Sequence, residues 1–235
     1  NVGVGRNTLK ATTTATYNTA VGDAALDVNT TGSDNVGVGA DALGQNTEGG
    51  SNVALGAYAL DANTTASDNT AVGKSALSAN TTGANNVAVG YTALDANTTG
   101  AQNIAIGAGG ALGANTTADY NIAIGYAAAA ANTTGTRNTA IGHNAYTASD
   151  TENDNLAIGY QAMTTNTAGG TLNIAIGNYA LDALTSGDQN VAVGHVALGA
   201  LNTGVNNTAV GDQAAQALTS GSNNTAMGVY ALDHT

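Results

Sequence analysis

The chain has 235 residues and a formal net charge of −12, with four basic residues against sixteen acidic ones and no Cys, Pro, Phe or Trp. A surface this acidic repels phosphate backbones, which argues against nucleic acid as a partner. The sequence also contains no run of about 18 apolar residues, the length that a membrane-spanning helix would need. The apolar residues are mostly Ala, Val, Ile and Leu. Side chains this small fill a thin interior better than the thick core of a compact domain.

One phrase recurs along the whole chain and opens each time on Asn. This Asn occupies positions 1, 18, 35, 52, 69, 86, 103, 121, 138, 155, 173, 190, 207 and 224, so that eleven of the thirteen intervals are 17 residues and two are 18. The two longer units place their extra residue near Gly109–Gly110 and Gly169–Gly170, where a loop tolerates it. A fixed period of this kind indicates a repeat architecture. We interpret residues 1–235 as a single repeat array and expect it to be a fragment of a longer chain.

The first element of each unit is a predicted strand, as at residues 87–89. Its second and fourth repeat positions, Val87 and Val89 in this unit, are apolar or β-branched and share one face of the strand. The third position is always Ala or Gly, as at Ala88. We expect this column to form an outward stripe that packs against a neighbouring chain; the alternative is packing against the other wall of the same coil. The fifth position is always Gly, which predicts a corner that needs positive φ or close backbone approach.

An apolar pair follows the corner, and a polar turn closes the unit. The pair, Ala25-Leu26 in the second unit, predicts a second short strand, and Asn29-Thr30-Thr31-Gly32 predicts the turn. Seventeen residues are too few for a helical hairpin, and alternation with period two is wrong for a helix. The sequence therefore predicts an all-β fold, a parallel β-solenoid of about fourteen 17-residue coils.

Stacking of the coils explains two of the columns. Equivalent residues of successive coils lie about 4.8 Å apart in such a fold. We expect the opening Asn residues to form a ladder in which each side-chain amide donates to the carbonyl above it. Asp27, Asp61 and Asp95 alternate with Gly44 and Ser78 at the tenth position. This alternation keeps the carboxylates two coils apart and weakens their repulsion.

The phrase Asn103-Ile104-Ala105-Ile106-Gly107 resembles the head repeats of trimeric autotransporter adhesins. The 17-residue unit with Asn-Thr-Thr-Gly is similar to long repetitive regions of phage tail-fibre-like proteins. The resemblance implies a left-handed parallel β-roll, with three rolls packed side by side as a homotrimer. It carries over no binding residue, because the matching positions are structural ones. The coil here is also longer than that of the adhesins by a polar turn.

Chemistry-bearing residues do not converge in the repeat. His143 and His195 occupy the variable sixth position three coils apart, and His234 lies in the last fragment. Nothing at a repeated spacing suggests a triad or a calcium-binding turn. We expect no enzymatic activity, no cofactor and no metal site.

Two other sets of residues are candidates for contacts or modification. Exposed Tyr is a good contact for sugars and proteins, although Tyr can equally cover the edge of a coil. The candidate surface contacts are Tyr58, Tyr91, Tyr126, Tyr160, Tyr179 and Tyr230. The Asn-x-Ser/Thr pattern also makes Asn29, Asn63, Asn80, Asn97, Asn115, Asn132, Asn206 and Asn223 candidate glycan acceptors, although the same residues suit a turn.

These features favour a structural and adhesive fibre segment, a phage tail fibre or a bacterial surface adhesin. We expect it to be extracellular, on a cell surface or virion, to assemble with copies of itself as a homotrimer or end-stacked fibre, and to hold its variable positions or a distal tip toward a host-surface glycan or protein. The alternative is a solenoid that binds ice or another ordered surface through stacked Thr, such as Thr30-Thr31 and Thr64-Thr65. That regularity ends after Thr133-Thr134, which favours the fibre.

Overall fold

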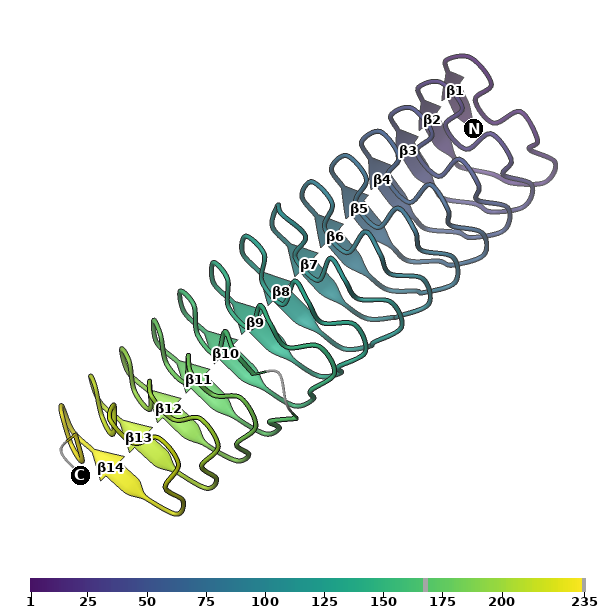
Figure 1. Cartoon of the computed structure of the whole chain (residues 1–235). Helices are drawn as coiled ribbons and strands as arrows, with labels where there is room; N and C mark the ends of the chain where they lie inside the picture. Colours follow the sequence, from purple (N-terminus) through teal and green to yellow (C-terminus); the bar gives the residue numbers. More distant parts are fainter. Residues whose placement is uncertain (167–168, 234–235) are drawn as a thin grey trace. The chain divides into compact units, whose positions relative to one another are not determined.

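The computed structural model describes residues 1–166 and 169–233. The chain divides into two compact units, Asn1–Tyr120 and Asn121–Thr235, which we call unit 1 and unit 2. One 17- or 18-residue repeat is called a coil. Among the described residues each unit consists of short parallel strands joined by turns (Figure 1). Nowhere in these residues is there a helix long and apolar enough to cross a membrane.

Each coil contributes one three-residue strand. In unit 1 the strands are β1 (Val2–Val4), β2 (Thr19–Val21), β3 (Val36–Val38), β4 (Val53–Leu55), β5 (Thr70–Val72), β6 (Val87–Val89) and β7 (Ile104–Ile106). In unit 2 they are β8 (Ile122–Ile124), β9 (Thr139–Ile141), β10 (Leu156–Ile158), β11 (Ile174–Ile176), β12 (Val191–Val193), β13 (Thr208–Val210) and β14 (Thr225–Met227).

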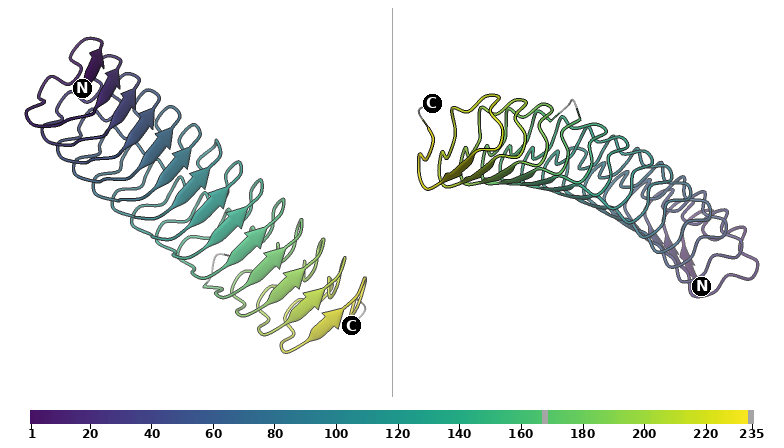
Figure 2. Two further views of the ribbon diagram at one scale, coloured as in Figure 1. Left: turned by 180° about the vertical axis from the view of Figure 1, so that it is seen from behind. Right: turned by 90° about the horizontal axis from the view of Figure 1, so that it is seen from below.

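Within each unit the strands pair in chain order, in parallel and in a constant register. In unit 1 Val36 lies opposite Val53, and in unit 2 Ile174 lies opposite Val191, so that the same repeat position is always paired. The strands of each unit lie on one face and the turn segments complete the coils (Figure 2). The predicted parallel β-solenoid with the repeat as its coil is confirmed.

The Gly that follows each strand forms the corner that the sequence predicts. Gly90 has a φ of 136°, a conformation that side chains with a Cβ rarely adopt. A Cβ at Gly90 would also collide with the carbonyl oxygen of Gly107 in the next coil. Backbone conformation and close stacking therefore both restrict this column to Gly.

The two faces of the strand are the reverse of the prediction. Ala20, Ala54, Ala88 and Ala123, at the third position, are 0% exposed in the single chain, so this column fills the interior of the coil instead of forming an outward stripe. The second and fourth positions face outward. The coil is flat and its inner space is narrow, so a methyl group fits inside where Val or Ile would overpack.

The predicted second strand is wrong. The apolar pair lies in a run of turns, in which the seventh and ninth positions adopt left-handed φ, as at Ala24 (54°) and Leu26 (52°). The conformation is unfavourable for Leu. Bonds between coils hold it, because the Leu26 amide donates to the Ala42 carbonyl at 3.1 Å and the Ala24 amide to the Arg6 carbonyl at 2.9 Å. Leu26 and its equivalents are nevertheless buried and complete the core.

The opening Asn forms the predicted buried ladder, in which the side-chain amide of one Asn donates to the carbonyl of the stacked Asn in several coils, as the Asn52 Nδ2 does to the Asn35 Oδ1 at 3.1 Å, and further bonds to the backbone accompany it. The Asn52 backbone amide donates to the Asn35 Oδ1 at 2.9 Å, and the Asn35 Nδ2 donates to the Gly49 carbonyl at 2.8 Å. A second ladder runs through the turn Asn, where the Asn46 Nδ2 donates to the Asn29 Oδ1 at 2.9 Å. Both columns are almost fully buried. Their amides therefore satisfy backbone groups that the thin interior hides from water.

Both of the 18-residue coils accommodate their extra residue in a turn, as the sequence predicts. Gly109 and Gly110 both have positive φ, at 72° and 73°, in the turn after β7. In the other 18-residue coil the Asn166 Nδ2 donates to the carbonyl of Gly170, four residues later. In an ordinary coil the Asn29 Nδ2 donates to the carbonyl of Gly32, three residues later.

Candidate functional site

Two columns of mostly aliphatic side chains cover the outer face of the strands in each unit, with Thr at the second position of five coils. At the fourth position Val38 is 36% exposed, Leu55 38%, Ile106 38% and Ile176 36%. The second position is half-buried beside them, and the constant register places each column in a straight line. A strip of partly exposed apolar side chains on a protein surface is a candidate contact surface. We call these two columns the sheet face.

Aromatic side chains stack on one another along the sixth and seventh positions of unit 2. The ring centroids of Tyr126 and His143 lie 5.2 Å apart, and those of His143 and Tyr160 lie 5.4 Å apart, with the rings nearly parallel in both pairs. Tyr179 then contacts Tyr160 edge to face at 5.4 Å, and His195 contacts Tyr179 edge to face at 6.3 Å. We call these five residues the aromatic stripe.

Polar side chains extend the aromatic stripe at its far end. The Nδ1 of His195 lies 3.0 Å from the Oδ1 of Asp212, and the Nε2 of Gln213 donates to the hydroxyl of Tyr230 at 3.2 Å. Partial burial, followed by the electrostatic interaction with Tyr160, raises the pKa of Tyr179.

The structure thus brings together three of the six candidate contact residues, Tyr126, Tyr160 and Tyr179. Tyr230 lies farther along unit 2, where its hydroxyl contacts Gln213. Tyr58 and Tyr91 lie in unit 1 and are 45% and 57% exposed, and the adjacent coils carry no aromatic residue at the same repeat position. The stacking of His143 and His195 with the Tyr residues was not anticipated. The signal for it is that the sixth and seventh positions of successive coils, considered together, hold Tyr or His. His234 lies outside the described residues.

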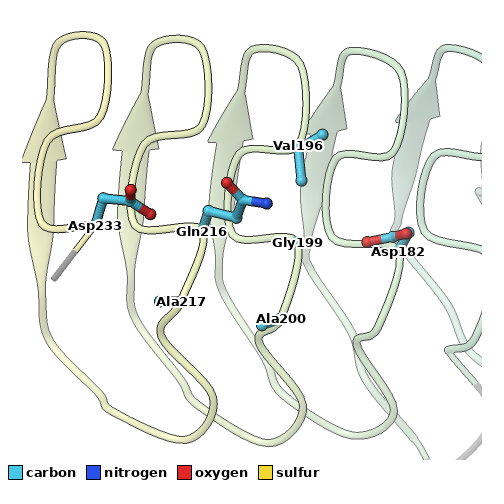
Figure 3. A pocket seen from close by; sticks show the side chains of 7 residues that line it. All are labelled: Asp182, Val196, Gly199, Ala200, Gln216, Ala217 and Asp233. Atoms are coloured by element: carbon cyan, nitrogen blue, oxygen red, sulfur yellow. The ribbon is translucent and has the colours of Figure 1, made fainter. Parts of the chain in front are cut away.

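A shallow groove runs beside the tenth position of unit 2 (Figure 3). Asp182 and Asp233 stand at its two ends, with Gly199 and Gln216 between them. A Cβ on Gly199 would lie 2.6 Å from the Val196 Cγ1 and 3.5 Å from the Asp182 Oδ1, so a side chain at this position would crowd the groove. Burial raises the pKa of Asp182.

In unit 1 the tenth repeat position holds the alternating Asp residues. The Asp61 carboxylate occupies the space that a Cβ on Gly44 would need. Burial, followed by the charge of Asp41, raises the pKa of Asp61. The alternation therefore provides room for a half-buried carboxylate, in addition to separating like charges.

One coil of unit 2 departs from the repeat around a buried tyrosine. Tyr146 replaces the usual Leu, and its hydroxyl accepts a bond from the Asn155 Nδ2 at 2.7 Å. Glu152 replaces the usual turn Gly and is 3% exposed. Its Oε2 accepts bonds from the Ser149 hydroxyl at 2.8 Å and from two backbone amides, while its Oε1 accepts one from the Gly169 amide at 3.0 Å. The carboxylate thus holds this turn together.

Burial separates the candidate glycan acceptors into two groups. Asn29, Asn63, Asn80, Asn97, Asn115 and Asn132 are 0% exposed. Their Nδ2 atoms donate to turn carbonyls inside the coil. The folded coil therefore gives no access to these six amides. Asn206 and Asn223 are exposed.

The paired Thr residues do not present two columns of free hydroxyls. The first Thr of each pair donates its hydroxyl to the next coil, as Thr30 does to the Thr47 carbonyl at 2.9 Å and Thr81 to the Thr98 carbonyl at 2.9 Å. The second Thr column is exposed, but Glu48 interrupts it. These coils therefore present one exposed Thr column, continuous from Thr65 to Thr117 in unit 1, in place of the two columns that stacked Thr pairs would form.

In the described part of the chain no group of three or more His, Cys, Asp or Glu side chains is placed to hold a metal ion. The chain matches no protein-family model, no curated protein and no solved structure.

Proposed function

We propose that this chain is a segment of a structural and adhesive fibre whose copies associate through the sheet face. The observation that carries the proposal is the strip of aliphatic side chains on the outer face of the strands, in register from coil to coil. Burial of such side chains contributes about 25 cal/mol per Å² of apolar surface. A second copy carries the same strip, so association of identical copies covers it without any other partner.

The arrangement that we propose is a homotrimer of left-handed β-rolls, with the sheet faces inside and the sixth and seventh positions outside. Three flat faces close around one axis, which ends the assembly at a finite number of chains. The stacked coils supply stiffness, and the variable positions are left free to contact a surface. In this arrangement the protein acts outside the cell or on a virion, and its role is mechanical rather than catalytic.

The contact between copies differs from the one that the sequence suggested. The Ala column is inside the coil, so it is unavailable to a partner. The aliphatic columns replace it as the interface, because they are the side chains that the single chain leaves exposed.

Sedimentation equilibrium of the full chain tests this proposal. The variant Val38→Glu/Leu55→Glu places two charges on the sheet face of neighbouring coils, where association would bury them unpaired. We expect the wild type to sediment as a trimer and the variant as a monomer that keeps its β-sheet circular dichroism. The matched control Ala40→Glu/Ala57→Glu adds two charges at the sixth repeat position of the same two coils, outside the sheet face, and should remain trimeric. A monomeric wild type would refute the proposal.

A further inference from the structure

We infer that the aromatic stripe of unit 2 is a binding site for a neutral, linear glycan. The inference rests on the proposed display function, because a fibre that holds its variable surface outward can use that surface for attachment. It concerns a different surface from the sheet face, so that the two can be tested apart.

Unit 1 shows whether the coil needs aromatic rings at the sixth position in order to fold. At the sixth position it carries Arg6, Asp23, Ala40, Ala57, Lys74, Tyr91 and Ala108, and it forms the same coils. Folding of the coil therefore does not require an aromatic residue at this position. Tyr126 is nevertheless 55% exposed and Tyr160 40% exposed, in a row that also includes His143. Aromatic surface that the fold does not need is available for a ligand.

The rings are held in place before any ligand arrives. Each ring of the stripe contacts the ring of the next coil at 5.2–6.3 Å between centroids. In addition the Tyr160 backbone amide donates to the Asn178 Oδ1 at 2.9 Å, which fixes the backbone that carries this ring, and the His195 Nδ1 lies 3.0 Å from the Asp212 Oδ1. Side chains that are already ordered lose little conformational entropy on binding.

The backbone carbonyls of the stripe are already hydrogen-bonded, which argues against an extended peptide as the ligand. The carbonyls of Tyr126, His143 and Tyr160 accept bonds of 3.0 Å from the next coil, and the His195 carbonyl accepts one of 2.8 Å. A peptide that adds to an edge as a strand needs free main-chain groups. The stripe offers phenol hydroxyls, imidazole nitrogens and ring surface instead, and hydroxyl-rich sugars use all three.

Charge selects a neutral glycan over an acidic one. Arg137 is the only Lys or Arg in unit 2, and its guanidinium is paired with Asp154 at 2.6 Å. Asp212 adds a carboxylate to the stripe, and the whole chain carries a net charge of −12. An anionic sugar would lose its hydration here without gaining a cation. The ring-to-ring distances are also close to the length of one pyranose unit, so that a linear glycan can follow the stripe across several coils.

Titration of the full chain with linear hexasaccharides tests the inference. The probes are neutral β-linked hexamers of glucose, of N-acetylglucosamine and of galactose, with hexagalacturonate as the acidic counterpart, followed by calorimetry and Tyr fluorescence. We expect at least one neutral hexamer to bind saturably and hexagalacturonate to bind at least about tenfold more weakly. Tyr160→Ala and His143→Ala should each weaken the neutral ligand by about tenfold or more.

Tyr91→Ala is the matched control, because Tyr91 occupies the same repeat position and is exposed but stands alone in unit 1. It should leave the affinity unchanged, and all three variants should sediment as the wild type does. Failure of every neutral hexamer to bind, equal binding of hexagalacturonate, or an equal loss in Tyr91→Ala would overturn the inference. If the sheet-face variant dissociates the assembly while no glycan binds, the fibre proposal stands and only the glycan site falls.

Discussion

The backbone amide of Asn35 donates a hydrogen bond of 2.9 Å to the side-chain Oδ1 of Asn18, its counterpart one coil earlier. Asn35 offers its own Oδ1 to the Asn52 amide in turn, so that a side chain continues the line of bonds between coils where the strand has not yet begun. The Asn35 Nδ2 also donates to the Gly49 carbonyl, so this position needs an acceptor and a donor on one short side chain. This requirement explains why the opening position of the repeat holds only Asn.

Asn35→Ala should destabilise the coil because it leaves the buried Asn52 amide without an acceptor. An unsatisfied buried amide costs about 1–3 kcal/mol, and we expect the midpoint of urea unfolding, followed by circular dichroism, to fall accordingly. The matched control is Thr31→Ala, an exposed side chain of the preceding coil, which should change the stability by less than about 0.5 kcal/mol. Equal effects of the two substitutions would contradict the ladder.

The coil and its register could be predicted from the sequence because each column records a separate constraint. Gly at the fifth position and Asn at the first tolerate no substitute, and both turn out to stand at points of close stacking. Alternation alone, however, shows only that Ala88 and Val89 lie on opposite faces. Which face is inside depends on the width of the coil, and this width follows from the turns rather than from the strand.

The conformation of the turns could not be predicted from the sequence, for a related reason. Leu26 is apolar, which predicts burial correctly but not its φ of 52°. A bulky residue in this conformation goes against local preference and is held by bonds to the next coil. At the candidate site, the Tyr positions could be predicted as exposed contacts, whereas the contact of Tyr160 with Tyr179 could not. It joins a sixth position to a seventh across coils, because Asn178 takes the sixth.

Gly90→Val should disrupt its coil for two independent reasons. The residue has a φ of 136°, and a Cβ would meet the Gly107 carbonyl oxygen. Strain of this kind costs about 1–3 kcal/mol before the collision is counted. We expect a clear drop in melting temperature. The control Ala40→Val adds the same side chain at the exposed next position of the repeat and should melt as the wild type does. A Gly90→Val protein with unchanged melting would show that the corner tolerates a Cβ.

Ala88→Glu should unfold the chain locally rather than only dissociate copies. Ala88 is 0% exposed inside the coil, so a carboxylate there would be buried without a partner. Breaking the core in this way costs about 3 kcal/mol or more. Val89→Glu, one residue along, places the same charge on the sheet face and should keep the β-sheet signal. Circular dichroism distinguishes the two variants, and loss of signal in Val89→Glu alone would reverse the assignment of the faces.

Glu152 should make the stability of unit 2 depend on pH in a defined direction. Burial alone would raise the pKa of Glu152, but the bonds from the Ser149 hydroxyl and the backbone amides outweigh it and lower the pKa below its ordinary value of about 4.5. A carboxylate with a lowered pKa in the folded state stabilises that state when it is ionised. This contribution is complete above about pH 4.5 and is lost as the pH falls through the lowered pKa.

Glu152→Gln removes this contribution and tests its sign. An amide cannot accept the bonds from Ser149, Asp150, Thr151 and Gly169 with both of its polar atoms, because its nitrogen is a donor. At pH 7 we expect the variant to be less stable by roughly 1–3 kcal/mol, the range for bonds to a charged group. The difference in melting temperature between wild type and variant should shrink as the pH falls through the lowered pKa of Glu152, because the wild-type carboxylate becomes protonated there. Glu48→Gln changes an exposed carboxylate and should show no such convergence. A difference that stayed constant from pH 7 to pH 3 would mean that the Glu152 side chain supports this turn through its shape and not through its charge.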